Sequence, residues 1–211
     1  MLPDIEYFNC LIILFLIGSI PTGYLLTKYS GHGDIRKVGS GNIGATNVLR
    51  HSGLKLGLLT FLLDFSKGFL PIFLILNNIL FTSPQVLTDV YFFLYLIYAA
   101  PILGHIFSPW LKFKGGKGVA TTFGAFAAPF LYAGSFTILL FLIPLVWLVT
   151  VFFTRYVALG SVFSLCFLTI YSSFFIKSYF ILFLLITLLI AYKHKDNFER
   201  IKNKTEHKIS F

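Results

Sequence analysis

The sequence predicts an all-α, polytopic membrane protein with about seven transmembrane helices in one bundle. Of its 211 residues, 57% are hydrophobic and only 12% are charged, whereas about 25% of residues are charged in soluble domains. The mean hydropathy is +0.84. A transmembrane helix needs about 20 apolar residues, so we expect a single domain, residues 1–211, with short loops. The composition excludes a soluble globular enzyme, a disordered tail and a disulfide-stapled secreted module.

Seven apolar runs are the expected spans, separated by short polar or basic segments. They are residues 7–26, 56–80, 90–107, a hairpin of two helices within 119–153, then 157–175 and 179–191. Pro21 is expected to kink the first span. The first half of the hairpin is rich in glycine and alanine, which favours close packing between helices in lipid. The turn at 77–89 contains no lysine or arginine, whereas the segments at 28–55 and 108–118 are basic and rich in glycine.

Lysine and arginine residues predict the orientation of the chain. With the N-terminus outside and the C-terminus in the cytoplasm, all of the 17 lysines and arginines lie in cytoplasmic segments except Lys67 and Lys177. The positive-inside rule favours this arrangement. The net charge of +9 is then explained without a nucleic-acid partner. Asp4 and Glu6 precede the first apolar run and no basic residue does, so we expect no cleaved signal peptide.

The first polar cluster, residues 39–50 (GSGNIGATNVLR), lies between the first two expected spans. Its glycines allow tight turns and leave backbone N–H groups accessible. Arg50 follows Thr46 by four positions, so both side chains share a face if the segment is helical. Backbone amides, neutral donors and a guanidinium group suit a phosphate. The alternative is a helix cap and turn that merely connects two spans. The candidate phosphate ligands are Ser40, Gly41, Asn42, Thr46, Asn47 and Arg50.

The second polar cluster is the loop KFKGGKG at residues 112–118. It is not a Walker A motif, because Leu111 stands where the first glycine is required and Gly118 follows Lys117. A cationic loop that enters a helix at Val119 is nevertheless a good anion site. The alternative, ordinary positive-inside charge, explains the lysines better than it explains the glycines. The candidates here are Gly115, Gly116, Lys117 and Gly118.

Further polar residues lie in the C-terminal tail and within the spans. His194 and Asn197 would share a helical face, and His194 has the chemistry of a general base, a phosphate donor or an interfacial residue. Asp64 and Lys67 lie three positions apart and are interpreted as a structural ion pair. Ser161 is better placed for a site than Ser164, near the cytoplasmic start of its span.

Several motifs of group-transfer enzymes are absent from the sequence. No histidine is followed by aspartate at the fifth position, no Gly-x-Ser-x-Gly elbow occurs and no metal-ligand cluster is present. Cys10 and Cys166 lie in apolar runs as ordinary small side chains. We therefore name no metal and no cofactor. Any chemistry without an obvious nucleophile needs an activated substrate held by oriented donors and cations.

Several of these motifs together resemble the bacterial acyl-phosphate:glycerol-3-phosphate acyltransferase family (PlsY). The resemblance is carried by SGNIGATNVLR at 40–50 and KGGKGVAT at 114–121, and the match extends in the same order over nearly the whole chain. The supporting segments are GSIPTGY at 18–24, GHIFSP at 104–109, TRYV at 154–157, and His194, Asn197, Arg200, Thr205 and Glu206 in the tail. The sequence departs from the family pattern at Ala158, where serine is usual, and at Lys204, where glycine is usual.

The resemblance implies a multi-pass enzyme of the bacterial inner membrane with a site that faces the cytoplasm. Such an enzyme transfers a fatty acyl group from acyl phosphate to the 1-hydroxyl of glycerol 3-phosphate. The products are lysophosphatidic acid and phosphate, in the first step of phospholipid synthesis. The implied partners are the two substrates and membrane lipids, with no nucleic acid, and we expect a monomer to be functional. We further expect direct attack by the glycerol hydroxyl without a covalent acyl-enzyme.

The residues and the resemblance together assign roles. The expected catalytic residues are Ser40, Arg50, Lys117, His194 and Asn197. The expected substrate or phosphate ligands are Gly41, Asn42, Thr46, Asn47, Gly115, Gly116, Gly118 and Ser161. Glu206, Asp64 and Lys67 are expected to support the site.

Two other classes of protein compete with an acyltransferase. A transporter or flippase of an anionic lipid or metabolite would also use basic glycine loops and intramembrane polar pairs, but its sites would lie at the bilayer midplane. The polar clusters here gather at one interface instead. A membrane scaffold without activity would have no use for so many polar glycine loops.

Overall fold

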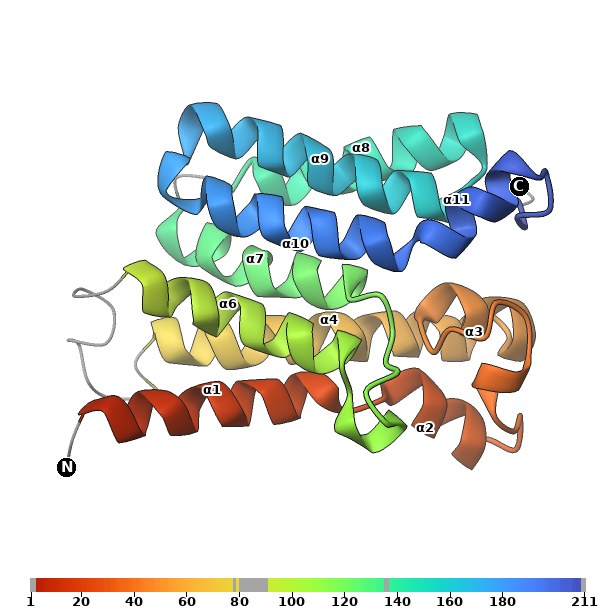
Figure 1. The fold of residues 1–211 in the computed structure, drawn as a ribbon, viewed down its shortest axis with the longest axis horizontal. Coiled ribbons are helices and arrows are strands. Elements are labelled where there is room, and N and C mark those ends of the chain that lie inside the picture. The colour runs from red at the N-terminus through yellow and green to blue at the C-terminus, as the bar shows by residue number, and fades with distance from the viewer. Residues whose placement is uncertain (1–2, 78, 80–90, 135–136, 210–211) are drawn as a thin grey trace. The chain divides into compact units, whose positions relative to one another are not determined.

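The computed structural model describes residues 3–77, 79, 91–134 and 137–209, and these residues form helices and no β-strand (Figure 1). The predicted all-α class is therefore confirmed for the described part of the chain. The chain divides into two compact units, Met1–Tyr132 and Ala133–Phe211.

The first unit is built around α4, a 23-residue apolar helix. Against it pack α1, α2, α3 and α6. The elements of this unit are α1 (Pro3–Ser19), α2 (Thr22–Tyr29), η1 (Ile35–Lys37), α3 (Ala45–Ser52), α4 (Leu54–Leu76), α6 (Tyr91–Ile106), η2 (Pro109–Leu111) and α7 (Val119–Ala133), where η marks a short 3-10 helix.

Glycines bring the backbones of this unit into direct contact. A Cβ atom at Gly68 in α4 would overlap the carbonyl oxygen of Thr121 in α7, and one at Gly124 in α7 would overlap that of Phe65 in α4. Close approach of this kind replaces the hydrophobic effect as the source of helix association in lipid. The predicted close packing of the small-residue helix is thus confirmed within the first unit.

The first span is broken at Pro21, as predicted, and α1 and α2 meet at an angle of 40°. The break frees backbone carbonyl groups, which must find donors because no water is present in the bilayer core. The hydroxyl group of Ser108 donates to the carbonyl oxygen of Ser19 at 2.6 Å. The ammonium group of Lys67 donates to the carbonyl oxygen of Ile20 at 2.9 Å. The broken span is therefore completed by side chains from two other elements.

The second unit is a helical layer in which α9 packs between α8 and α10. Its elements are α8 (Leu139–Thr154), α9 (Val157–Phe175), η3 (Lys177–Tyr179), α10 (Phe180–Lys193) and α11 (Lys195–Lys202). The hydroxyl groups of Thr169 and Thr187 lie 2.9 Å apart between α9 and α10. The last two helices are bent by 53° at His194.

The predicted spans coincide with helices to within a few residues. Within the described ranges, three helices are long and apolar enough to cross a membrane, or up to five if each bent pair counts as one span. The helices of the expected hairpin, α7 and α8, have 15 and 16 residues, so the count of seven stays a prediction. Leu80, the expected end of the second span, lies outside the described residues, as does most of the expected turn at 77–89.

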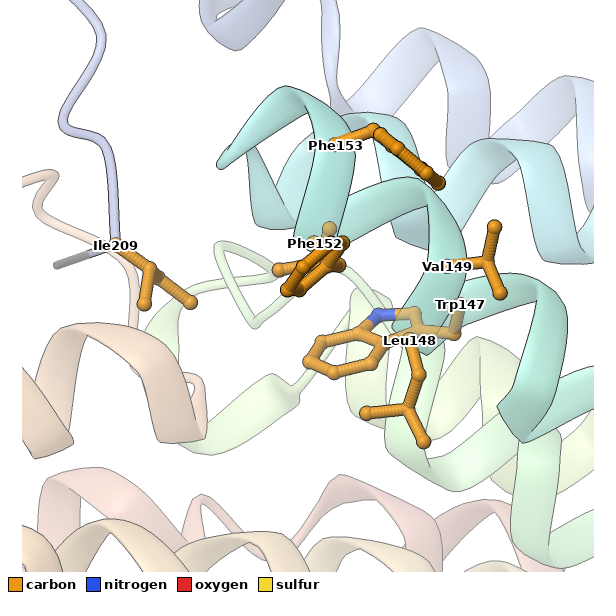
Figure 2. A pocket seen from close by; sticks show the side chains of 7 residues that line it. Trp147, Leu148, Val149, Phe152, Phe153 and Ile209 are labelled. Carbon is orange, nitrogen blue, oxygen red and sulfur yellow. The ribbon is translucent and has the colours of Figure 1, made fainter. Parts of the chain in front are cut away.

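An apolar groove of about 470 Å³ runs along the second unit. Figure 2 shows side chains of α8, among them Trp147, Leu148 and Phe152, together with Ile209 from the C-terminal segment. Phe152 and Phe153 are exposed, as expected for a helix that faces lipid. Because apolar side chains line this groove, it does not suit a phosphate.

Candidate functional site

The loop before α3 is organised by one side chain, Asn47. Its Nδ2 donates to the carbonyl oxygens of Ile35, Val38 and Asn42 at 3.2, 3.1 and 2.8 Å. Its Oδ1 accepts from the backbone N–H of Ser40 at 3.1 Å. Asn47 is only 3% exposed. The carboxamide thus holds the loop together from inside, although the sequence suggested a substrate contact.

Glycines shape the same loop. Gly39 and Gly41 have φ values of +57° and +70°, a region that residues with a Cβ atom rarely enter. A Cβ atom at Gly39 would also overlap Oδ1 of Asn47. Asn42 accepts the backbone N–H of Gly44 at 3.1 Å through its Oδ1. Tight turns were predicted from these glycines, and the structure has them.

The candidate phosphate ligands of the first cluster lie on the outside of this loop and on α3. Ser40, Gly41 and Arg50 are exposed, and Thr46 is half-buried. Because residues 45–52 are helical, Thr46 and Arg50 share a face, which fulfils the condition set by their spacing.

Arg36 precedes this loop and is engaged with Asp34. Its Nη2 lies 2.7 Å from Oδ2 of Asp34, and its guanidinium group lies over the Tyr24 ring. The hydrogen bond from Arg36 lowers the pKa of the Asp34 carboxyl group to about 2. This pair caps η1 and fixes the start of the loop.

The second cluster, the glycine loop, is docked on the end of α6. The backbone N–H of Gly115 donates to Ile106 and that of Gly116 donates to His105, both at 3.1 Å. A Cβ atom at Gly115 would overlap the carbonyl oxygen of His105. After the half-buried Lys117, Gly118 turns with φ +84° and α7 begins. The expected entry into a helix at Val119 is confirmed.

The two loops are joined by a small hydrophobic cluster. Ile35 comes from η1, Ile43 from the first loop, Val48 from α3, and Leu111 from η2, directly before the second loop. All four are less than 5% exposed. Helix α3, which carries Arg50, and the loop that carries Lys117 therefore belong to one corner of the first unit.

The predicted ion pair lies in the same unit, within α4. Nζ of Lys67 is 2.8 Å from Oδ1 of Asp64, and the hydroxyl group of Thr22 donates to the same oxygen. Nδ1 of His105 lies 3.5 Å from it. Asp64, Lys67 and His105 are all buried. A buried pair is tolerated only when its charges are matched and hydrogen-bonded, and this pair satisfies that requirement.

The third cluster lies in the second unit, at the bend between α10 and α11. Nδ1 of His194 lies 2.8 Å from the carbonyl oxygen of Ile190. A carbonyl oxygen only accepts, so Nδ1 carries the hydrogen and Nε2 bears the lone pair of the neutral ring. Nδ2 of Asn197 donates to Oε1 of Glu206 at 2.9 Å, and Nε of Arg200 donates to Oε2 at 2.7 Å. Glu206 thereby holds the tail against α11.

Two departures from the family pattern have local consequences. Lys204 adopts φ +58°, so the usual turn is made by a lysine in the left-handed region. At the other departure, Ala158 is buried, and the hydroxyl group of Ser161 donates to the carbonyl oxygen of Val157 at 2.9 Å. Ser161 can still accept a hydrogen bond, but its own hydrogen is used within α9.

Comparison with known proteins identifies the family. The model of the family described as Glycerol-3-phosphate acyltransferase matches residues 8–204. The chain belongs to this family. It is accordingly a membrane acyltransferase, and the resemblance seen in the motifs is confirmed. A glycerol-3-phosphate acyltransferase of Thermosipho melanesiensis is 39% identical over 96% of this chain and 92% of its own length. One from Pelagibacter ubique is 38% identical over 96% and 97%.

Solved structures of the same family share the fold. A crystal structure of PlsY (YgiH), an integral membrane glycerol 3-phosphate acyltransferase, in its glycerol 3-phosphate form has a TM-score of 0.82. It is 34% identical, and the match covers 97% of this chain and 96% of that one. The lysophosphatidic acid form has a TM-score of 0.79 at 32% identity over the same shares.

The family residues divide between the two units. The first unit contains α3 with Arg50, the loop with Lys117 and the Asp64–Lys67 pair, and the second brings together His194, Asn197 and Glu206. Sequence reasoning missed His105, which contacts both Asp64 and the glycine loop. No local pattern links a histidine to an aspartate 41 positions earlier, so only the fold exposes this contact.

Proposed function

We propose that this enzyme transfers a fatty acyl group from acyl phosphate to the 1-hydroxyl of glycerol 3-phosphate, forming lysophosphatidic acid and phosphate. The observation that supports it most is the corner of the first unit, where two glycine loops join through Ile43, Val48 and Leu111. Cationic side chains and backbone N–H groups from both loops suit phosphoryl groups. The glycerol 3-phosphate and lysophosphatidic acid forms of the family structure name a matching substrate and product.

The proposed step needs no acyl-enzyme intermediate. The glycerol oxygen forms a bond to the acyl carbon, and the bond from that carbon to the phosphate oxygen breaks with its electron pair on phosphate. The hydroxyl proton goes to a substrate phosphate oxygen or to His194. Arg50, Lys117 and the loop amides stabilise the charge on the leaving phosphate, and one such donor typically contributes about 10²–10³ in rate.

The remaining predicted residues take supporting roles in this proposal. Ser40, Thr46 and the backbone N–H group of Gly118 are the neutral donors to phosphate, whereas Gly116, whose N–H donates to His105, shapes the loop. Ser161 accepts a hydrogen bond from a substrate hydroxyl. The further candidates Gly41, Asn42 and Gly115 shape the loops, Asn47 and Glu206 hold their segments in place, and Asn197 orients the tail beside His194.

We also propose a membrane arrangement for the enzyme. Residues 1–211 form a single domain of seven spans in the bacterial inner membrane, with the N-terminus outside and the C-terminus in the cytoplasm. The distribution of lysine and arginine supports this orientation. In this orientation the phosphate loops lie on the cytoplasmic side of the membrane. A monomer suffices for activity.

The test is direct detection of the product from purified protein in detergent. With acyl phosphate and glycerol 3-phosphate we expect lysophosphatidic acid by mass spectrometry, and phosphate release that requires glycerol 3-phosphate. An acyl thioester of the same chain length serves as the donor control and should give no product. Product from the thioester alone would refute the donor assignment. Flux of an anionic lipid in vesicles without any chemistry would favour a carrier.

A further inference from the structure

His105 connects the buried ion pair to the glycine loop. It lies in the last turn of α6 and is 4% exposed. On one side, its Nδ1 lies 3.5 Å from Oδ1 of Asp64. On the other side, the atoms nearest to a Cβ placed at Gly116 are Nε2, Cε1 and Cδ2 of the His105 ring. The imidazole ring therefore stands between a fixed carboxylate and the loop that carries Lys117.

We propose that His105 is a positioning residue for Lys117. Asp64 fixes the imidazole ring, and the ring fixes the backbone of Gly115 and Gly116, so that the next residue, Lys117, is held where a substrate phosphate binds. This inference rests on the proposed function, because it takes Lys117 as a phosphate ligand.

Residue 116 is a glycine for a different reason from residue 118. Gly118 needs to be glycine because its φ is +84°, whereas Gly116 has no positive φ. What excludes a side chain at Gly116 is the His105 ring. The backbone of His105 also accepts the N–H of Gly116 at 3.1 Å. Both the ring and the carbonyl group of one residue thus determine the path of the loop.

Asp64 can orient the His105 ring only if its own carboxylate is held in place. Its Oδ1 accepts from Thr22 in α2 and lies 2.8 Å from Nζ of Lys67, which itself donates to Ile20. Partners from separate elements fix the carboxylate, and in a low-dielectric interior such a network holds one orientation. A displacement of about 1 Å at a substrate-binding group can cost about 10² in rate, so this support has functional consequence.

A double-mutant cycle tests the proposal. His105→Ala, Lys117→Ala and the double variant are assayed with acyl phosphate and glycerol 3-phosphate. If His105 acts through Lys117, His105→Ala lowers kcat/KM by about 10- to 100-fold in the wild-type background. In the Lys117→Ala background it lowers kcat/KM by less than about threefold. His32→Ala, an exposed histidine outside the network, is the matched control and keeps wild-type kinetics.

The outcomes separate the two proposals. An equal fold loss from His105→Ala in both backgrounds, or no loss at all, would overturn the positioning role. Normal turnover of Lys117→Ala would overturn the role of Lys117 and with it that of His105. A wild-type protein that makes no lysophosphatidic acid would overturn the proposed function. The contact between His105 and Gly116 would then be tested by melting temperature alone.

That stability measurement needs no activity. Gly116→Ala should lower the melting temperature in detergent, because the new methyl group meets the His105 ring. In the His105→Ala background the ring is gone, so Gly116→Ala should cause little further loss. The same decrease in both backgrounds would show that His105 does not define the path of the loop.

Discussion

The side-chain amide of Asn197 donates a hydrogen bond to the Glu206 carboxylate at 2.9 Å, across a turn of nine residues. The other carboxylate oxygen accepts from Nε of Arg200 at 2.7 Å. One buried carboxylate thus ties the C-terminal segment to the helix that follows His194. Glu206, which the sequence predicts to support the site, thus holds the C-terminal segment against α11.

Glu206→Gln is expected to loosen this segment. Glutamine keeps an oxygen for Asn197 but presents an amide instead of a carboxylate to Arg200, and the loss of one charge-assisted bond costs about 1–2 kcal/mol at a partly exposed pair. Hydrogen exchange at residues 200–206 should become faster, and activity should fall. Glu199→Gln, at an exposed position of the same helix, is the control. Equal rates of hydrogen exchange in the two variants would show that Glu206 does not hold this segment in place.

Arg50→Ala and Lys117→Ala are expected to lose most activity while the protein still inserts and folds. Removal of one donor to a developing anion typically costs about 10²–10³ in kcat. Product formation is measured by mass spectrometry on protein that elutes as a single species in detergent. Lys37→Ala removes an exposed cation beside the same loop and should leave turnover unchanged. Near-normal turnover of either site variant would remove that residue from the proposed mechanism.

Asn47→Asp is expected to open the loop before α3. The carboxylate would face three carbonyl oxygens that now receive a hydrogen bond, and unsatisfied buried acceptors cost about 1–3 kcal/mol. Backbone amides of residues 35–42 should lose protection from hydrogen exchange. Asn42→Asp is a matched control, since the bond from Gly44 needs only an oxygen acceptor. If both variants left the loop equally protected, the organising role of Asn47 would be wrong.

Lys204→Gly is expected to stabilise the protein. A lysine in the left-handed region carries a strain of about 1–2 kcal/mol, which glycine relieves, although glycine gives back about 0.5–1 kcal/mol through the unfolded chain. The melting temperature in detergent should rise slightly. Glu199→Gly, at an exposed position in the interior of α11, should lower it, because glycine within a helix costs about 1 kcal/mol. Shifts of the same sign would contradict this account of the turn.

The Asp34–Arg36 pair should stabilise the folded protein at neutral pH and lose this contribution in acid. The pKa of Asp34 is about 2 in the folded protein, below the ordinary value of about 3.9. Its contribution is therefore present above about pH 4 and is lost as the pH falls toward about 2. NMR titration of the Asp34 carboxyl carbon checks the pKa. A midpoint near the ordinary value of about 3.9 would mean that the pair does not persist in solution.

The positions of the helices could be predicted from the sequence because burial in lipid leaves long apolar runs. The run at 157–175 coincides with α9, and the break at Pro21 follows from the missing backbone N–H of proline. The sequence predicts that Thr46 and Arg50 share a face only if their segment is helical, and it does not establish that helix. It is realised because the loop before it is closed by Asn47.

The long-range contacts could not be predicted in the same way. The contact between Asp64 and His105 joins two helices, and neither spacing nor composition encodes it. Likewise, Asn47 has the residue type of a phosphate ligand. Only the folded loop shows that its side-chain amide donates to three carbonyl oxygens instead. Amphipathic pattern reports which face is apolar, whereas the pairing of polar groups inside a bundle depends on how the helices are rotated against one another.

The broken first span has a consequence for how the chain is made. The carbonyl groups of Ser19 and Ile20 receive their hydrogen bonds from Ser108 and Lys67, which lie 89 and 47 residues further along. A nascent chain that delivers its first helix to the translocon cannot yet satisfy them. Until the third apolar segment leaves the ribosome, these carbonyl groups need hydrogen bonds from water, lipid headgroups or an insertase. The order of synthesis thus makes this break one of the last features of the first unit to mature.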